Sequence, residues 1–315
     1  MYEQLLGLDD VRINFSAGGM HVVNIVLAFV MFGVALGIRL QMFKDVLRHP
    51  KSVILGLFCQ WVALPAVTFL LVILLNNYIT PMVAMGMILV ASCPGGNISN
   101  FMSQFSKGNT ELSISLTAVT TAFSTVVTPF NFAFWGGMYV NFISKTAGEA
   151  LQTLHIDTFQ MFETVFLLLG LPLLAGGLVV KFLPKVAQML KKPLQYLSIL
   201  FFVAMVVMAF SNNVSLFLQH ILFIFFLVLV HNSMALLTGF GLSTALKIPR
   251  ADRRSLTIET GIQNSGLGLV LLFNPKIFPP DLAIGGMLFV TAWWGIWHII
   301  SGLGLSFFWS RRPIK

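Results

Sequence analysis

The sequence predicts an all-α polytopic membrane protein, with nine transmembrane helices, an inverted repeat and two discontinuous helices. The first observation behind this prediction is composition. Of the 315 residues, 57% are hydrophobic and only 10% are charged, and the mean hydropathy is +0.88. Soluble domains carry about a quarter charged residues, so this composition indicates that a lipid bilayer is the solvent. The other observations are the spacing of the apolar segments and two matching interruptions in them.

Nine segments are long and apolar enough to cross a bilayer, which takes about 20 residues of helix. They lie at about residues 22–41, 52–75, 80–106, 110–138, 158–181, 194–211, 217–246, 252–274 and 283–308. Little chain remains outside them, so we expect residues 1–315 to form a single membrane domain. The first residues lack the basic start and small-residue cleavage site of a secretory signal, so we expect the amino terminus to be retained.

The basic residues are distributed by topology. The odd-numbered connections and the carboxyl terminus contain 16 of the 19 Lys and Arg residues, leaving Arg12, Lys145 and Lys276 for the other side. The positive-inside rule therefore places the amino terminus outside and the carboxyl terminus in the cytoplasm. This distribution explains the net charge of +8 without nucleic-acid binding.

Cys59 and Cys93 lie in predicted spans, where a thiol is usually an apolar filler, so we expect neither a disulfide nor a thiol metal site.

The third and eighth predicted spans are interrupted. In ASCPGGNISN, residues 91–100, one proline and two glycines remove a helical N–H and add two flexible positions. In SLTIETGIQNSGLGLVLLFN, residues 255–274, polar groups lie between two glycines. Spans two to four match spans seven to nine in order and length, and an offset of five spans reverses orientation. This is typical of an inverted repeat, about 22–138 and 158–308, with broken helices at the midplane. Simple kinks in packed helices are the alternative.

Glu259 is the informative charge, because a charge at the bilayer centre costs about 2.5–3.5 kcal/mol. No Lys or Arg lies near the middle of a predicted span, so we expect a bound cation or a proton as its partner. A protonated side chain that makes one interhelical hydrogen bond is the alternative. Neutral oxygen donors near the breaks are Gln60, Ser99, Asn100, Ser113, Thr117 and Gln263. One carboxylate with neutral oxygens suits a monovalent ion such as sodium better than a divalent ion.

Polar residues at the expected starts of the second half-helices are candidates for substrate binding. Asn97 directly follows the glycine pair, and Asn264 with Ser265 occupies the corresponding place in the second break. Free N–H groups and positive dipole ends at such positions suit a carboxylate or sulfate. A plain N-cap role is the alternative for either Asn. His298, in the last span, is a candidate for a hydrogen bond to a substrate or to a neighbouring helix.

Two long motifs, CPGGNISN at 93–100 and ETGIQNSG at 259–266, resemble those of the bile acid:sodium symporter family. KGNTELSISLT at 107–117, GLFCQWVALPA at 56–66 and WHIISG at 297–302 extend the resemblance over essentially the whole chain. The ETG.QN form and the nine spans are more similar to vertebrate members than to ten-span bacterial ones. The resemblance implies a core domain with two crossed discontinuous helices, about 52–138 and 217–308, and a smaller panel domain, about 22–41 and 158–211.

The resemblance also implies two sodium sites. The first would comprise Ser99, Asn100, Ser113, Thr117 and Glu259. The second would comprise Gln60, Glu259, Gln263 and the backbone carbonyls of Thr260 and Ile262. Ile299 stands where family members have a polar amide residue, which weakens the case for the family's usual substrate.

These features together predict a sodium-coupled symporter that imports an organic anion, either bile acid-like or a small carboxylate, by alternating access. Two sodium ions would be the coupling ions, and no other cofactor is expected. Proton-coupled or uncoupled transport is the alternative. We expect no enzyme, because every Asp lies in or beside a loop and neither GxSxG nor HExxH occurs; an intramembrane hydrolase and a non-transporting receptor are remote alternatives. Substrate, host and oligomeric state stay open, with a monomer in a bacterial inner membrane as the working assumption.

Overall fold

The structure is a computed structural model that describes residues 2–9, 17–37, 50–147, 163, 166–211, 214–274, 277–279 and 282–312. The end of the first predicted span (38–41) and most of the start of the fifth (158–162, 164–165) lie outside these residues, as does Lys276. Among these described residues, four helices are long and apolar enough to cross a membrane by length and composition, namely Pro50–Leu74, Thr110–Ser144, Leu218–Ala245 and Gly285–Ser310. The count of nine spans therefore stays a prediction.

The described residues form helices that follow the predicted segments with altered ends. In chain order they are α1 (Tyr2–Asp9), α2 (Ala17–Ala35), α4 (Pro50–Phe58), the π-helix η2 (Cys59–Ala63), α5 (Leu64–Leu74), α6 (Pro81–Ser92), α7 (Ile98–Phe105), α8 (Thr110–Ala147), the π-helix η4 (Phe166–Gly170), α10 (Leu171–Phe182), α11 (Pro184–Ser211), α12 (Val214–Ala245), α13 (Arg250–Gly261), α14 (Ser265–Leu272) and α15 (Gly285–Ser310). α8 continues past the predicted end at residue 138 because Tyr139 and Ile143 are buried on its extension. α11 begins ten residues before the predicted start. The prediction counted apolar residues, and the lysines in the first turns of α11 lower that count.

A π turn that the sequence reading did not anticipate joins α4 to α5. Pro65 follows this turn, has no N–H, and opposes the carbonyl four residues before it, that of Trp61. Asn131 of α8 supplies the missing donor, with Nδ2 at 2.9 Å from the Trp61 oxygen. Gln60 lies within the π turn and is buried, with 1% of its surface exposed. The turn thus holds an amide side chain inside the helical assembly.

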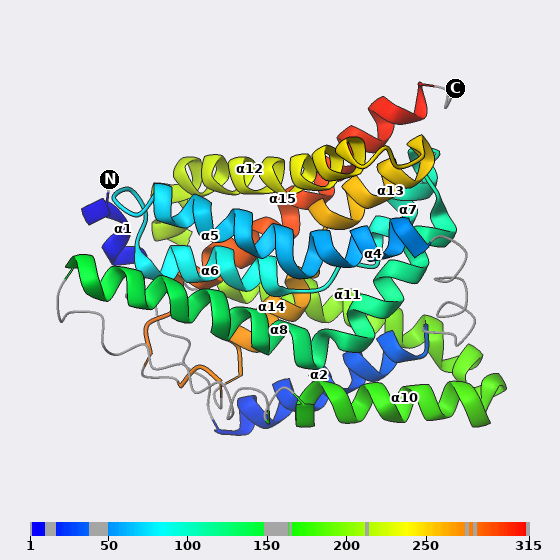
Figure 1. Cartoon of the computed structure of the whole chain (residues 1–315). Helices are drawn as coiled ribbons and strands as arrows, with labels where there is room; N and C mark the ends of the chain where they lie inside the picture. Colours follow the sequence, from blue (N-terminus) through cyan, green and yellow to red (C-terminus); the bar gives the residue numbers. More distant parts are fainter. Residues whose placement is uncertain are drawn as a thin grey trace.

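The helices form two packed groups (Figure 1). α2, α10 and α11 pack against one another, and Figure 1 shows α2 and α10 along the lower side of the molecule. The larger group contains α4 to α8 and α12 to α15, in which α12 packs on α13 and α6 packs on α15. The two groups meet where α11 contacts α15 and where η4 contacts α8. Both interrupted helices, α6–α7 and α13–α14, belong to the larger group.

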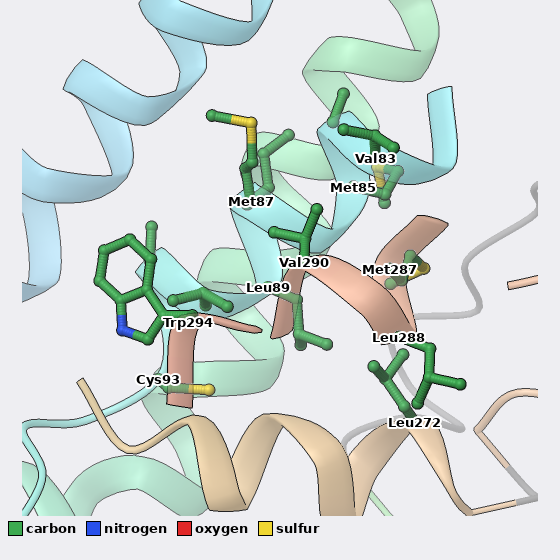
Figure 2. Packing of buried hydrophobic residues seen from close by; sticks show 14 of the residues in the cluster. Val83, Met85, Met87, Leu89, Cys93, Leu272, Met287, Leu288, Val290 and Trp294 are labelled. Carbon is green, nitrogen blue, oxygen red and sulfur yellow. The ribbon is translucent and has the colours of Figure 1, made fainter. Parts of the chain in front are cut away.

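The main apolar core lies where α6 packs along α15 (Figure 2). Figure 2 shows Val83, Met85, Met87 and Leu89 of α6 close to Met287, Leu288, Val290 and Trp294 of α15. Two glycines allow the close approach: a Cβ on Gly86 would lie 2.7 Å from the Met287 Cα, and a Cβ on Gly286 would lie 2.7 Å from the Val83 nitrogen. Small residues let helix backbones approach closely inside a membrane. This contact holds the first half of one interrupted helix in place.

Candidate ion and substrate site

The two interruptions lie against each other and satisfy each other's backbone. The Gly96 N–H donates to the Ile262 carbonyl at 2.8 Å, and the Asn264 N–H donates to the Pro94 carbonyl, also at 2.8 Å. Together they form a short antiparallel bridge between the two breaks. Broken helices expose unpaired N–H and C=O groups, which are costly where water is absent. Because the breaks pair with each other, irregular backbone is tolerated in the middle of the helical assembly.

We call the place where the two interruptions meet the crossing. Glu259, in the last turn of α13, is fully buried beside it. Its Oε1 accepts hydrogen bonds from the Ser99 hydroxyl, from Ser113 at 2.5 Å and from Thr117 at 3.1 Å. Its Oε2 accepts from Thr117 at 3.1 Å and from the Gln60 Nε2 at 3.5 Å. In the described part of the chain, these hydrogen-bond partners are all neutral. Residues from η2, α7, α8 and α13 therefore converge on one uncompensated carboxylate.

Two of the hydroxyls around Glu259, those of Ser113 and Thr117, each lie within hydrogen-bond distance of more than one acceptor oxygen. The Ser113 Oγ also lies 2.9 Å from the Asn100 Oδ1, and the Thr117 Oγ1 lies 3.2 Å from the same atom. A hydroxyl carries one proton and can serve one acceptor at a time. An oxygen-rich cluster with few protons fits a hard cation. Five of the predicted ligands, Ser99, Asn100, Ser113, Thr117 and Glu259, thus lie together in an arrangement that suits sodium.

The second predicted set also lies at the crossing, but its groups are partly engaged. The Gln60 Oε1 accepts from the Gly95 N–H at 3.1 Å, and the Gln263 Nε2 donates to the Thr260 carbonyl at 2.8 Å. The Ile262 carbonyl accepts the bond across the breaks, which leaves it one lone pair. The Gln263 Oε1 is buried and has no hydrogen-bond partner among the described residues. A buried acceptor without a donor is costly, and a cation would satisfy it.

Sequence reasoning missed a second amide that holds a break in place. The Asn232 Nδ2 of α12 donates to the Gly261 carbonyl at the end of α13, at 2.7 Å. Its Oδ1 accepts from the Ser301 hydroxyl of α15 at 2.5 Å. Asn131, which caps the π turn, was missed in the same way. The available signal was an amide side chain inside a predicted span, where polar groups form hydrogen bonds between helices.

A cavity of about 380 Å³ lies where α2 and α11 face the two breaks. Its apolar wall includes Val30, Met31, Val34, Ile199 and Phe201. All four predicted substrate residues, Asn97, Asn264, Ser265 and His298, line it as well. Among the described residues that line the cavity, none is a Lys or an Arg. The cavity is thus apolar on one side, with polar groups and the starts of α7 and α14 on the other.

The polar residues of the cavity are engaged to different extents. The Asn264 Oδ1 accepts from the Leu267 N–H at 3.1 Å and is an N-cap of α14, the alternative that the sequence left open. Asn97 begins α7 without such a bond, and its side chain is exposed. His298 is 5% exposed, and its Nδ1 has no hydrogen-bond partner in the residues described. Ile299 also lines the cavity, so the wall beside His298 is apolar.

Comparisons with known proteins agree with this architecture. The model of the sodium bile acid symporter family matches residues 24–220. The chain is 32% identical over 293 residues to the uncharacterized sodium-dependent transporter YocS of Bacillus subtilis, covering 93% of this chain and 84% of that protein. It is 26% identical over 302 residues to human sodium/bile acid cotransporter 4, covering 93% and 66%.

A further relative is longer than this chain. The bovine P3 protein is 29% identical over 236 residues, which cover 75% of this chain and 47% of that protein. The chain therefore spans about half the length of the P3 protein. The family model matches more than half of the chain, and the Bacillus relative matches nearly all of it. The chain belongs to the sodium bile acid symporter family.

Proposed function

We propose that this protein imports an organic anion together with sodium by alternating access. The observation that carries the proposal is Glu259, a fully buried carboxylate whose described hydrogen-bond partners are neutral oxygens and an amide. A buried charge of this kind requires a cation or a proton. Membership of the family and the sodium-dependent relatives support sodium as the coupling ion.

Two sodium ions would bind on either side of the Glu259 carboxylate. One would be held by Ser99, Asn100, Ser113, Thr117 and Glu259. The other would be held by Gln60, Glu259, Gln263 and the carbonyls of Thr260 and Ile262. The first ion would replace crowded hydrogen bonds by ion–oxygen contacts and draw α7, α8 and α13 together, and the second would join η2 to α13 and the second break. Because both breaks contribute ligands, sodium would order the crossing that forms one wall of the cavity.

The cavity is the proposed substrate site. α7 and α14 begin at it, and the positive ends of their helix dipoles suit an anionic group. Its apolar wall on α2 and α11 suits a hydrocarbon body. Human sodium/bile acid cotransporter 4 and the chloroplast sodium/metabolite cotransporters carry names that fit this class of ligand. The substrate would be an amphipathic, bile acid-like anion or a small carboxylate.

Alternating access would use the two packed groups as panel and core. α2, α10 and α11 would form the panel, and the larger group with both interrupted helices would form the core. The cavity lies between them, so a rigid-body movement of one against the other would expose it to each side in turn. The protein would lie in a bacterial inner membrane with its carboxyl terminus in the cytoplasm.

The test is the thermal stability of purified protein in sodium compared with choline, for the wild type and Glu259→Gln. A ligand at about 100 times its Kd stabilises by about 2.7 kcal/mol. We expect a sodium-specific rise in Tm for the wild type and no rise for the variant. A panel of bile acids and small carboxylates, screened in sodium, should then give a further rise that disappears in choline.

Proton coupling is the second candidate, because the hydroxyls around Glu259 would also solvate a protonated carboxyl. It predicts a Tm that is equal in sodium and choline but changes with pH in the wild type and not in Glu259→Gln. That result would replace sodium by a proton in the mechanism.

A further inference from the structure

A second cavity, of about 200 Å³, lies where α13 begins and α15 ends. Six residues line it, namely Phe240, Arg250, Arg253, Arg254, Trp309 and Arg312. We call it the arginine cavity. Four of the six are arginines and, within the described chain, none is acidic. It shares no lining residue with the proposed substrate cavity, so the transport mechanism makes no use of it.

The four arginines differ in how their donors are used. Arg254 is buried and committed to the backbone, since its Nη1 lies 2.6 Å from the Ser106 oxygen and its Nη2 lies 2.9 Å from the Arg312 oxygen. Arg253 gives its Nη2 to one backbone carbonyl, but its Nε is buried without a partner. Among the described residues, no acceptor hydrogen-bonds the guanidinium groups of Arg250 and Arg312. The Arg254 side chain therefore holds the surrounding backbone in place. Arg250, Arg253 and Arg312 have donors that can hydrogen-bond a ligand.

Among the described residues that line it, the arginine cavity has no carboxylate to balance the guanidinium charges. Four guanidinium groups around one small cavity repel one another, and backbone carbonyls offset only part of that repulsion. Planar guanidinium groups with free N–H donors bind phosphate with two parallel hydrogen bonds. An anion with several oxygens would satisfy the Arg253 Nε and the free donors at once. The chemistry of the cavity therefore points to a phosphate group.

The surroundings of the arginine cavity favour a lipid as the source of that phosphate. Phe240 belongs to a row of exposed apolar residues along one face of α12, which are Val230, Met234, Leu237 and Phe240. Phe308 of α15 is also exposed, and the Arg312 guanidinium lies 4.0 Å from its ring centroid. Acyl chains would lie along these side chains. The positive-inside rule places this end of the molecule in the cytoplasm, where the membrane leaflet is anionic.

We propose that the arginine cavity binds the phosphate of an anionic phospholipid. Arg250, Arg253 and Arg312 hold the headgroup, and the apolar row of α12 contacts the acyl chains. Bound lipid would join the beginning of α13 to the end of α15. The proposal does not depend on the identity of the transported substrate or of the coupling ion.

The test compares phosphatidylglycerol with phosphatidylcholine in mixed micelles, using the Tm of the full chain. The cavity variant is Arg250→Gln with Arg312→Gln. The matched control is Lys185→Gln with Arg311→Gln, which removes two exposed positive charges from the same predicted side. Each arginine that hydrogen-bonds the headgroup phosphate contributes about fivefold to affinity. We expect the cavity variant, which loses two such arginines, to need roughly thirtyfold more phosphatidylglycerol for half-maximal stabilisation, and the control to stay close to the wild type.

Three results would overturn the proposal. Equal losses in the cavity variant and the control would show that general surface charge attracts the lipid. Equal stabilisation by phosphatidylcholine would show that the headgroup charge is irrelevant. Inorganic phosphate that reproduces the full rise without lipid, and fails to do so in the cavity variant, would assign the cavity to a free phosphate compound instead. The cooperative unfolding transition without phosphatidylglycerol, measured in parallel, reports whether each variant is folded, and it should be present in both.

Discussion

At the residue scale, the protein is organised around one buried carboxylate. Burying an ionised carboxylate without a counter-charge is very costly, and hydrogen bonds offset only part of the cost. The Ser113 hydroxyl lies within hydrogen-bond distance of both Glu259 and Asn100, but its one proton can be donated to only one of them at a time. In the proposed mechanism the Ser113 Oγ binds the sodium ion. The oxygens of Glu259 and Asn100 would then also bind the ion and would not need the Ser113 proton.

Ser113→Ala should weaken sodium binding selectively. Removing one oxygen from a charged cluster should raise the sodium concentration for half-maximal thermal stabilisation by about tenfold. The control is Ser124→Ala on the same helix, because the Ser124 hydroxyl is buried but donates only to the Thr121 carbonyl at 2.7 Å. The control should leave the sodium concentration unchanged. Equal effects of both substitutions would show that Ser113 acts through helix stability and not through the ion.

At the element scale, two local irregularities position the site. The π turn places Gln60 in the helical assembly, and its amide then bonds the Gly95 N–H of the first break. Short π segments within α-helices occur frequently at functional sites. The turn persists because Asn131 supplies the donor that Pro65 lacks. A residue on a neighbouring helix thus maintains the local geometry of α4 and α5.

Asn131→Leu should destabilise the protein by about 1–3 kcal/mol, because it removes the Asn131 donor from the part-buried Trp61 carbonyl. Pro65→Ala returns an N–H to this turn. The double variant should therefore be less destabilised than the sum of the two single variants, by a coupling energy of about 0.5 kcal/mol or more. Thermal unfolding of the four proteins measures it. Simple additivity would show that Asn131 and Pro65 act independently.

The first break depends on a missing side chain at Gly95. A Cβ there would lie 2.8 Å from the Glu259 Oε2 and 3.2 Å from the Gln60 Nε2, and both side chains are buried. Gly95→Ala should therefore abolish most of the sodium-dependent rise in Tm and cost about 1–3 kcal/mol through overpacking. Gly304→Ala is the control, because a Cβ on that helical glycine meets nothing within 4 Å. It should be neutral or stabilising by up to about 1 kcal/mol. A normal sodium response in Gly95→Ala would contradict the proposed site.

At the scale of the whole molecule, the smaller helical group is tightly packed within itself. A Cβ on Gly33 would lie 2.8 Å from the Leu194 Cβ, and a Cβ on Gly176 would lie 2.5 Å from the Ala35 Cβ. These glycines bring α2 against α11 and α10. Tight internal contacts, with the cavity on the other side of α2 and α11, suit a unit that moves as one body during transport.

Transport should respond to the membrane potential. Two sodium ions with one monoanion move one net positive charge inward, which is worth about 2.3 kcal/mol per 100 mV. In proteoliposomes, an inside-negative potential of about 100 mV should raise the equilibrium accumulation of the best monoanion from the thermal screen by roughly fiftyfold. Replacing sodium with choline should abolish the effect. Accumulation that does not depend on the membrane potential would indicate electroneutral transport, with one sodium ion for each monoanion.

The membrane class, both interruptions and many of the polar residues that meet at them could be predicted from sequence. The apolar composition indicates a membrane environment, and Pro94 with its two glycines removes a helical N–H and adds two flexible positions, which disfavours a continuous helix. Glu259 could be singled out because an ionised group within an apolar span is expensive in any fold. The end of α8 and the start of α11 were predicted less well. Counting apolar residues does not detect the part of a helix that extends beyond its apolar segment.

The inward position of Gln60, the donors on Asn131 and Asn232, and the walls of both cavities required the tertiary structure. Gln60 and Glu259 are 199 residues apart, and Asn131 and Trp61 are 70 apart. Such pairs depend on how helices pack, and no local pattern specifies which carbonyl lacks a donor until the neighbouring helix is in place. Composition and local helix breakers act through the residues themselves, whereas these contacts exist only between segments that the fold brings together.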